Sequence, residues 1–286
     1  MHATQRHQPH PPHVASQQEL TLSIPSGALQ VRRHGTKEPL ALGVPGLSAN
    51  RFSFEALGKA HPALAAVDLR GRGRSPAGAR GTHGWENHAK DILDAATALG
   101  AEAFDLLGHS MGAFIALVVA NRAPHRVRRL VLIDGVGVPD PLAMGPIYAA
   151  VTRLGTVYPS AEDFLGKVAA AGVVPWSPFW ERHYREDLVD VPGGGVRQLA
   201  ARHAVVEDLA YGSLQVGVRN LWPGLRAPTL LVRASLPIAG GHVVTPCDRD
   251  AFQRAVPRAQ VVEVPANHYG VMNHPTTAAA VSEFLA

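Results

Sequence analysis

Short apolar and β-branched runs recur along the first half of the chain, each bounded by glycine, proline or charged residues. Runs of this length and composition are typical of strands. They predict strands at residues 20–24, 28–32, 40–44, 64–68, 104–107 and 130–134. Longer stretches between the later runs predict helices at residues 52–59, 85–99 and 111–122. This alternation favours an α/β fold with a mostly parallel central sheet flanked by helices.

The pattern changes after Asp134, where glycine, proline and aromatic residues are interleaved and strand signals stop until residue 229. A structureless loop of that length is uncommon, so we expect a helical insertion. The α/β pattern then returns, with strands at 229–233 and 260–264 and helices at 249–255 and 275–285. The predicted organisation is a core domain formed by two segments, residues 19–134 and 223–286, with the insertion at 135–222 between them.

The first residues, 1–18, carry four histidines and three prolines but no apolar stretch typical of a secretory signal. We expect a disordered tail there, and a cytoplasmic location. No apolar run elsewhere approaches the roughly 18 to 20 residues that a membrane span needs, so we expect no membrane partner.

Composition narrows the possible functions. Hydrophobic residues make up 46% and charged residues 17%, which is typical of a globular protein rather than a disordered one. The 27 Lys and Arg exceed the 23 Asp and Glu only slightly and are spread along the chain, so we do not expect nucleic acid as a partner. The single cysteine, Cys247, offers no disulfide or metal-binding spacing. We expect no metal and no cofactor.

One segment carries a specific chemical signal. The sequence Gly108-His109-Ser110-Met111-Gly112 has the form G-x-S-x-G and joins a predicted strand to a predicted apolar helix. That context places a serine in a sharp, strained turn, where glycines avoid collisions between strand and helix. Ser110 is therefore the candidate nucleophile, with its hydroxyl at the carboxyl edge of the sheet.

With this motif the chain resembles the α/β-hydrolase fold superfamily, from about Leu20 to Ala286. The sequence DLRGRGRS at 68–75 resembles the family's D-x-R-G-x-G-x-S turn. The resemblance is to serine hydrolases, similar to esterases and cofactor-free perhydrolases. It implies that the insertion after the strand ending at Asp134 is a helical lid.

A serine hydroxyl needs a neighbouring base to act as a nucleophile. His268 follows the last predicted strand, which is where the resemblance places the catalytic histidine. His109 is adjacent to Ser110 only along the chain, and we expect it on the structural side of the turn.

The histidine in turn needs a carboxylate that orients it. In most of the family this acid follows the strand predicted here at 229–233, but residues 234–241 contain none. The next carboxylates, Asp248 and Asp250, lie where a helix begins, a position at which aspartate is commonly a cap. A minority arrangement puts the acid one strand earlier, at Asp134. We favour Asp134 and keep Asp248 and Asp250 as alternatives.

The oxyanion donors are expected to be backbone groups. The family usually has His-Gly after an early strand, but His34-Gly35 precedes the strand at 40–44. The matching position is Pro45-Gly46-Leu47, so the N–H groups of Leu47 and Met111 are the candidates.

These residues predict a serine hydrolase that acts through an acyl-enzyme on Ser110. The apolar residues of the insertion and the resemblance imply that its substrate is a small to medium, largely apolar carboxylic ester, lactone or thioester. The same residues would serve a C–C bond hydrolase, an acyltransferase or a cyclase, which stay open as alternatives. A non-catalytic ligand-binding protein on this fold is the alternative of another class. The oligomeric state does not follow from the sequence.

Overall fold

A computed structural model describes residues 17–215 and 217–286 of the chain. The predicted disordered tail falls outside the described residues as far as residue 16, and its predicted end overlaps the first strand, which begins at Gln18.

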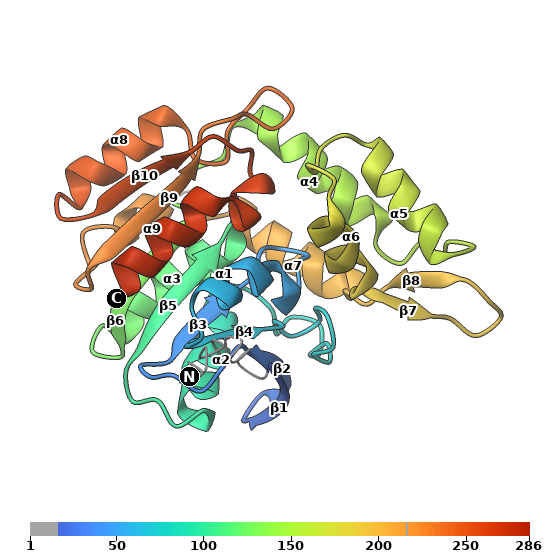
Figure 1. Ribbon diagram of the computed structural model, residues 1–286, viewed down its shortest axis with the longest axis horizontal. Coiled ribbons are helices and arrows are strands. Elements are labelled where there is room, and N and C mark those ends of the chain that lie inside the picture. Colours follow the sequence, from blue (N-terminus) through green and yellow to red (C-terminus); the bar gives the residue numbers. More distant parts are fainter. Residues whose placement is uncertain (1–16, 216) are drawn as a thin grey trace, which may run out of the picture.

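An eight-stranded sheet forms the centre of the molecule, in the order β1-β2-β4-β3-β5-β6-β9-β10 (Figure 1). The strands are β1 (Gln18–Ile24), β2 (Gly27–Arg33), β3 (Ala41–Val44), β4 (Leu64–Val67), β5 (Phe104–His109), β6 (Val127–Ile133), β9 (Thr229–Ala234) and β10 (Gln260–Val264). The pairs β1–β2 and β2–β4 are antiparallel. The remaining pairs are parallel, as expected for strands joined by crossover helices. β3 to β6 are fully buried over most of their length, which explains why they read as continuous apolar runs.

Helices cover both faces of this sheet (Figure 1). One face is packed by α1 (Glu55–Ala60) and α9 (Pro275–Leu285), and the other by α2 (Trp85–Ala98), α3 (Met111–Arg122) and α8 (Pro246–Ala255). Three short 3-10 helices complete the core: η1 (Arg51–Phe54), η2 (Val218–Leu221) and η3 (Gly270–Asn273). The predicted helix at 52–59 is thus divided between η1 and α1.

α3 is apolar on all sides because it is covered on all sides. Its residues from Met111 to Ala120 are buried between the sheet and the outer layer of the core. On its outer side the ring of Phe114 stacks on Trp85 of α2, with 4.8 Å between ring centroids. Such a pair contributes roughly 0.5–1.5 kcal/mol beyond the area it buries. The helix that follows Ser110 is therefore held rigidly against the sheet.

The segment between β6 and β9 is an insertion that forms its own lobe (Figure 1). Its helices are α4 (Pro141–Arg153), α5 (Ala161–Ala170), α6 (Pro178–Arg185) and α7 (Arg202–Ser213). It also contains a hairpin, β7 (Leu188–Asp190) with β8 (Val196–Gln198). The sequence had predicted only helices in this insertion. Three-residue strands are too short to show periodicity, although the glycines at 193–195, all with positive φ, are a turn signal.

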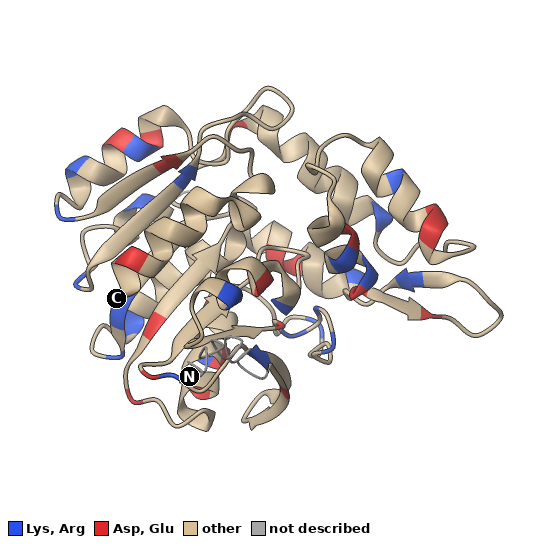
Figure 2. Ribbon diagram, viewed as in Figure 1, with Lys and Arg blue, Asp and Glu red and all other residues tan. Residues whose placement is uncertain are grey.

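Charged residues of both signs are interspersed over the core and the insertion (Figure 2). Within the described residues no helix is long and apolar enough to cross a membrane.

Candidate active site

Ser110 lies in the turn between β5 and α3 with φ 55° and ψ −122°, a conformation that L residues rarely adopt. Two glycines make this turn possible. A Cβ atom at Gly108 would collide with the backbone of Gly112, and one at Gly112 would collide with the carbonyl oxygen of Val44 on the neighbouring strand. The turn therefore holds the Ser110 hydroxyl at the carboxyl edge of the sheet, beyond the strand ends.

His268 lies in the loop after β10, and its Nε2 is 3.0 Å from Oγ of Ser110. The loop is held by Asn267, whose Oδ1 accepts hydrogen bonds from the N–H groups of Tyr269 (3.1 Å) and Gly270 (2.9 Å). The side-chain amide of Asn267 also donates to the carbonyl of Val173 in the insertion (2.9 Å). The imidazole is buried, so its position is set by these neighbours rather than by solvent.

Asp134 directly follows β6, and its Oδ2 is 2.8 Å from Nδ1 of His268. Its other oxygen, Oδ1, accepts a hydrogen bond from the N–H of Ala234 at the end of β9 (3.1 Å). A buried carboxylate can only accept here, so Nδ1 of His268 carries the proton and the Nε2 lone pair faces Ser110. The carboxylate thus selects the tautomer in which the histidine can act as a base toward Ser110.

The two alternative acids lie elsewhere. Asp248 is buried in the first turn of α8, where it accepts hydrogen bonds from Val138 N–H (3.1 Å) and from Nε of Arg219 (2.9 Å). Asp250 pairs with Arg249 at the surface of the same helix (2.7 Å). The structure therefore brings Asp134 to His268 and leaves Asp248 and Asp250 in other interactions.

The loop after β3 brings Leu47 beside Ser110. Within the described residues, neither the N–H of Leu47 nor that of Met111 donates to a protein acceptor, and both residues line the same cavity as Ser110. Met111 is the first residue of α3, so its N–H also lies at the positive end of the helix dipole. These two amides can receive a negative oxygen that develops next to Ser110.

The hydrogen bond that holds the Leu47 loop was not predicted from the sequence. Nε of Arg72, from the DLRGRGRS turn, donates to the carbonyl oxygen of Leu47 (2.9 Å). The Arg72 side chain is fully buried and is paired with Asp208 of α7, which also lies 2.8 Å from Nε2 of His88. Burial raises the pKa of Asp208, but the hydrogen bond with His88 and the charge of Arg72 outweigh burial and lower the pKa to about 2. The turn identified from its sequence is therefore a support for the loop that carries Leu47.

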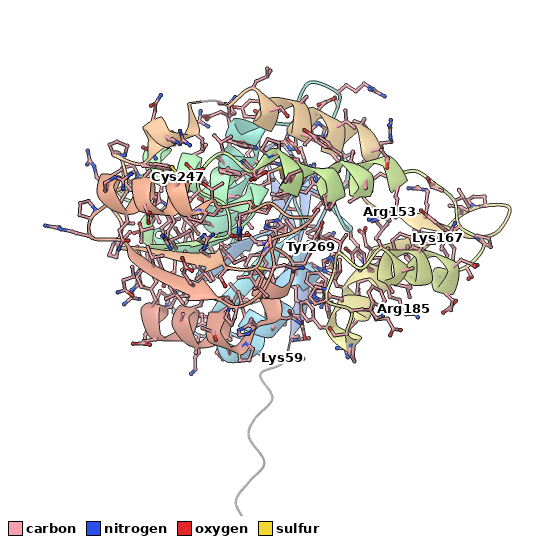
Figure 3. The ribbon with its side chains drawn as sticks, turned by 90° about the horizontal axis from the view of Figure 1, so that it is seen from above. Lys59, Arg153, Lys167, Arg185, Cys247 and Tyr269 are labelled. Carbon is pink, nitrogen blue, oxygen red and sulfur yellow. The ribbon has the colours of Figure 1, made fainter. Side chains whose placement is uncertain are left out.

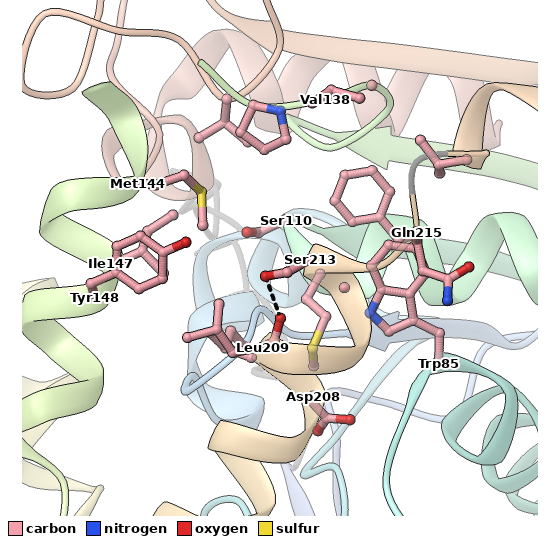
Figure 4. Close-up of a pocket in the computed structure, with 18 of the residues that line it drawn as sticks. Trp85, Ser110, Val138, Met144, Ile147, Tyr148, Asp208, Leu209, Ser213 and Gln215 are labelled. Atoms are coloured by element: carbon pink, nitrogen blue, oxygen red, sulfur yellow. Dashed lines mark hydrogen bonds between the residues drawn. The ribbon is translucent and has the colours of Figure 1, made fainter. Parts of the chain in front are cut away.

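A cavity of about 390 Å³ opens beside Ser110. Figure 4 shows Ser110 facing it, with Met144 and Ile147 of α4 on one side and Trp85 of the core on the other. Most other lining groups are also apolar, and the insertion and the core both contribute them. The cavity can hold the apolar part of a small molecule with its reactive carbonyl at Ser110.

A comparison with protein families matches residues 43–275 to the alpha/beta hydrolase fold. The chain belongs to this family. The fold predicted from the sequence, a mostly parallel sheet flanked by helices, is thereby confirmed.

Individual relatives add detail to this family. The chain is 28% identical over 254 residues to N-formylmaleamate deformylase of Pseudomonas putida, covering 81% of this chain and 82% of that protein. A shorter stretch of 83 residues is 43% identical to 2-hydroxymuconate semialdehyde hydrolase of Pseudomonas putida, covering 28% of each chain. Among solved structures, that of E-2-(acetamidomethylene)succinate hydrolase superimposes with a TM-score of 0.84 at 24% identity, over 94% of this chain and 99% of that one. These relatives support a hydrolase.

Proposed function

We propose that this α/β-hydrolase cleaves an acyl bond of a small molecule through an acyl-enzyme on Ser110. The observation that carries the proposal is the continuous hydrogen-bonded line from Ser110 Oγ through the imidazole of His268 to Asp134, with distances of 3.0 and 2.8 Å. Nucleophile, base and orienting acid come from three separate loops at one edge of the sheet. Such a constellation has the geometry of a serine hydrolase triad.

The proposed mechanism has two halves. In the first, Oγ of Ser110 attacks the carbonyl carbon while Nε2 of His268 takes the hydroxyl proton, and Asp134 stabilises the resulting imidazolium. The N–H groups of Leu47 and Met111 hold the oxyanion, and His268 then passes the proton to the leaving group.

In the second half, a water molecule attacks the acyl-enzyme, and His268 removes its proton. Collapse of this intermediate releases the carboxylic acid and returns the proton to Ser110 Oγ. The apolar walls of the 390 Å³ cavity reduce the local dielectric, which strengthens both the ion pair and the oxyanion contacts.

An ester, lactone or thioester is the first substrate class that we propose, because these acyl bonds are the most reactive toward an activated serine. The insertion is proposed to be the lid of the site, since α4 and α7 supply residues that line the cavity opposite the sheet. The reducing cytoplasm is the proposed compartment, which fits a chain whose single cysteine has no disulfide partner within it.

Cleavage of another acyl bond with the same residues is a second candidate. The relatives named above are a deformylase and a semialdehyde hydrolase, and a further relative, 36% identical over 103 residues, is a putative carbamate hydrolase of Agrobacterium fabrum. Parallel turnover assays with substrates in which an ester, an amide or a C–C bond is cleaved separate this candidate from an esterase.

Labelling by a fluorophosphonate probe, followed by peptide mapping, tests the proposal without knowledge of the substrate. We expect wild-type protein to be labelled at Ser110, Ser110→Ala not to be labelled, and His268→Ala to lose nearly all labelling. Folded wild-type protein that is not labelled would favour a non-catalytic binding protein instead.

A further inference from the structure

A second, smaller cavity of about 70 Å³ adjoins the first. The two cavities share Leu47, Ser110 and Ile147, and the smaller one continues past His268 toward the insertion. A larger share of the side chains that line it carry polar groups than in the large cavity. Among them are Arg153, His183, Tyr184, Asp187, Gln198 and Tyr269.

Among the residues that the structure describes, Arg153 is the one lysine or arginine that lines either cavity. It is the last residue of α4, and Nη1 donates weakly to the carbonyl of Ala149 one turn earlier (3.3 Å). Its Nε is buried without a hydrogen-bond partner. No carboxylate in residues 17–215 or 217–286 forms an ion pair with it. A partly buried guanidinium without an anion is unfavourable, and its planar fork matches a carboxylate.

Below pH 7 the groups around Arg153 leave its charge unopposed. Burial lowers the pKa of His183 to about 4, so that imidazole is neutral at pH 7. Burial also raises the pKa values of Tyr184 and Tyr269, which therefore keep their hydroxyl protons and can donate them in hydrogen bonds. Burial raises the pKa of Asp187 to about 7, so this carboxyl is largely protonated below that pH.

The charge and size of the cavity select the kind of group that fits. A single cation matches a monoanion, whereas a phosphate dianion would leave one charge unpaired in a confined site. About 70 Å³ admits a group of a few heavy atoms. We propose that the small cavity is a subsite for a carboxylate of the substrate, bound by the guanidinium of Arg153.

This inference rests on the proposed acyl hydrolysis at Ser110, and it defines the substrate more closely. The substrate is an acyl compound with a carboxylate at one end. The carboxylate occupies the small cavity, the apolar remainder occupies the 390 Å³ cavity, and the reacting carbonyl lies between them at Ser110.

A pair of esters of the same acid tests the subsite. Monoethyl fumarate carries a free carboxylate, diethyl fumarate does not, and the trans double bond prevents the carboxylate from assisting its own ester. The readout is the ratio of kcat/KM for the monoester to that for the diester. We expect Arg153→Met to lower this ratio about 100-fold and Arg153→Lys, which keeps the charge but not the fork, to lower it about 10-fold.

The matched control is Arg185→Met, which removes an exposed arginine of the same insertion that lines neither cavity (Figure 3). It should leave the ratio unchanged. The subsite would be overturned if Arg153→Met lowered kcat/KM equally for both esters, or if Arg185→Met lowered the ratio as much as Arg153→Met. Either result would leave acyl hydrolysis intact.

Binding measured by calorimetry separates the two proposals when no ester is turned over. Linear dicarboxylates from malonate to adipate, and fumarate, are titrated into wild type, Arg153→Met and Arg185→Met. Binding of at least one of them that is weakened tenfold or more only in Arg153→Met supports the subsite, whatever the outcome of fluorophosphonate labelling at Ser110. If none binds, or all bind these three proteins alike, the subsite is wrong.

Discussion

The imidazole of His109 lies against that of His268, with ring centroids 4.7 Å apart and planes inclined by 28°. Nε2 of His109 donates to the backbone carbonyl oxygen of His268 (3.0 Å). Burial first, and then the proximity of His268, hold the pKa of His109 well below its usual range, so the ring is neutral. The residue before the candidate nucleophile therefore supports the candidate base.

His109→Phe keeps a ring in this position but removes the donated hydrogen bond. We expect the rate of fluorophosphonate labelling at Ser110 to fall about fivefold, because one hydrogen bond contributes about 1 kcal/mol and its loss releases the His268 backbone. The control is His125→Phe, which changes an exposed histidine away from the site. A labelling rate equal to that of wild type would show that the bond does not position His268.

The choice between Asp134 and Asp248 has a direct test. Asp134→Asn should lower the turnover number by about 10⁴, since an amide cannot select the same tautomer or stabilise the imidazolium. Asp248→Asn should leave turnover within a few-fold and lower the free energy of unfolding by about 1–3 kcal/mol, because Asp248 accepts from Arg219 and Val138 N–H. Rate assays and denaturant unfolding of both variants check this. The reverse order of effects would make Asp248 the acid.

Arg72 connects the DLRGRGRS turn to the Leu47 peptide. Arg72→Lys removes the Nε–H that donates to the Leu47 carbonyl, so we expect the Leu47 amide to shift and kcat to fall by about 10- to 100-fold, with KM little changed. The matched control is Arg70→Lys in the same turn, whose partner is the buried Asp91 (2.6–2.7 Å). Arg70→Lys should reduce stability without the loss in kcat. Equal losses in kcat for both variants would indicate general damage to the turn.

Asp187 predicts a pH-dependent stability. Its pKa rises from 3.8 to about 7 on folding, so between these values the folded protein holds a proton that the unfolded chain has released. The free energy of unfolding therefore falls as pH rises through this window, by as much as about 4 kcal/mol. Asp187→Asn cannot ionise and should be more stable than wild type at pH 8, with a smaller difference at pH 4.5.

Urea unfolding of wild type and Asp187→Asn at the two pH values measures this difference. His183 changes stability in the opposite sense, because its lowered pKa makes the fold lose stability as pH falls toward 4, but it is present in both proteins and cancels. Asp190→Asn, at the exposed end of β7, is the control. A stability difference that does not vary with pH would contradict the raised pKa of Asp187.

Local sequence was sufficient for the fold and for the candidate nucleophile. Apolar runs marked the strands of the main sheet, because buried parallel strands need continuous apolar side chains on both faces. The G-x-S-x-G turn is also local: its glycines, its serine and the apolar helix after it lie within a few residues. Local signals failed for the hairpin β7–β8, whose strands are short and held mainly by the surrounding lobe.

The sequence by itself determined that this chain has an α/β-hydrolase core, a serine at the elbow and a histidine after the last strand, since each depends on neighbouring residues. Only the tertiary structure decided which carboxylate meets His268. Asp134 and Asp248 are both buried aspartates after the nucleophile, but Asp134 follows β6 at the sheet edge, whereas Asp248 lies in the first turn of α8. The same holds for Arg72 at Leu47, His109 under His268 and Arg153 in the small cavity. These contacts join residues distant in sequence, and side-chain distances of about 3 Å between such loops are set by the packing of the whole sheet and its helices.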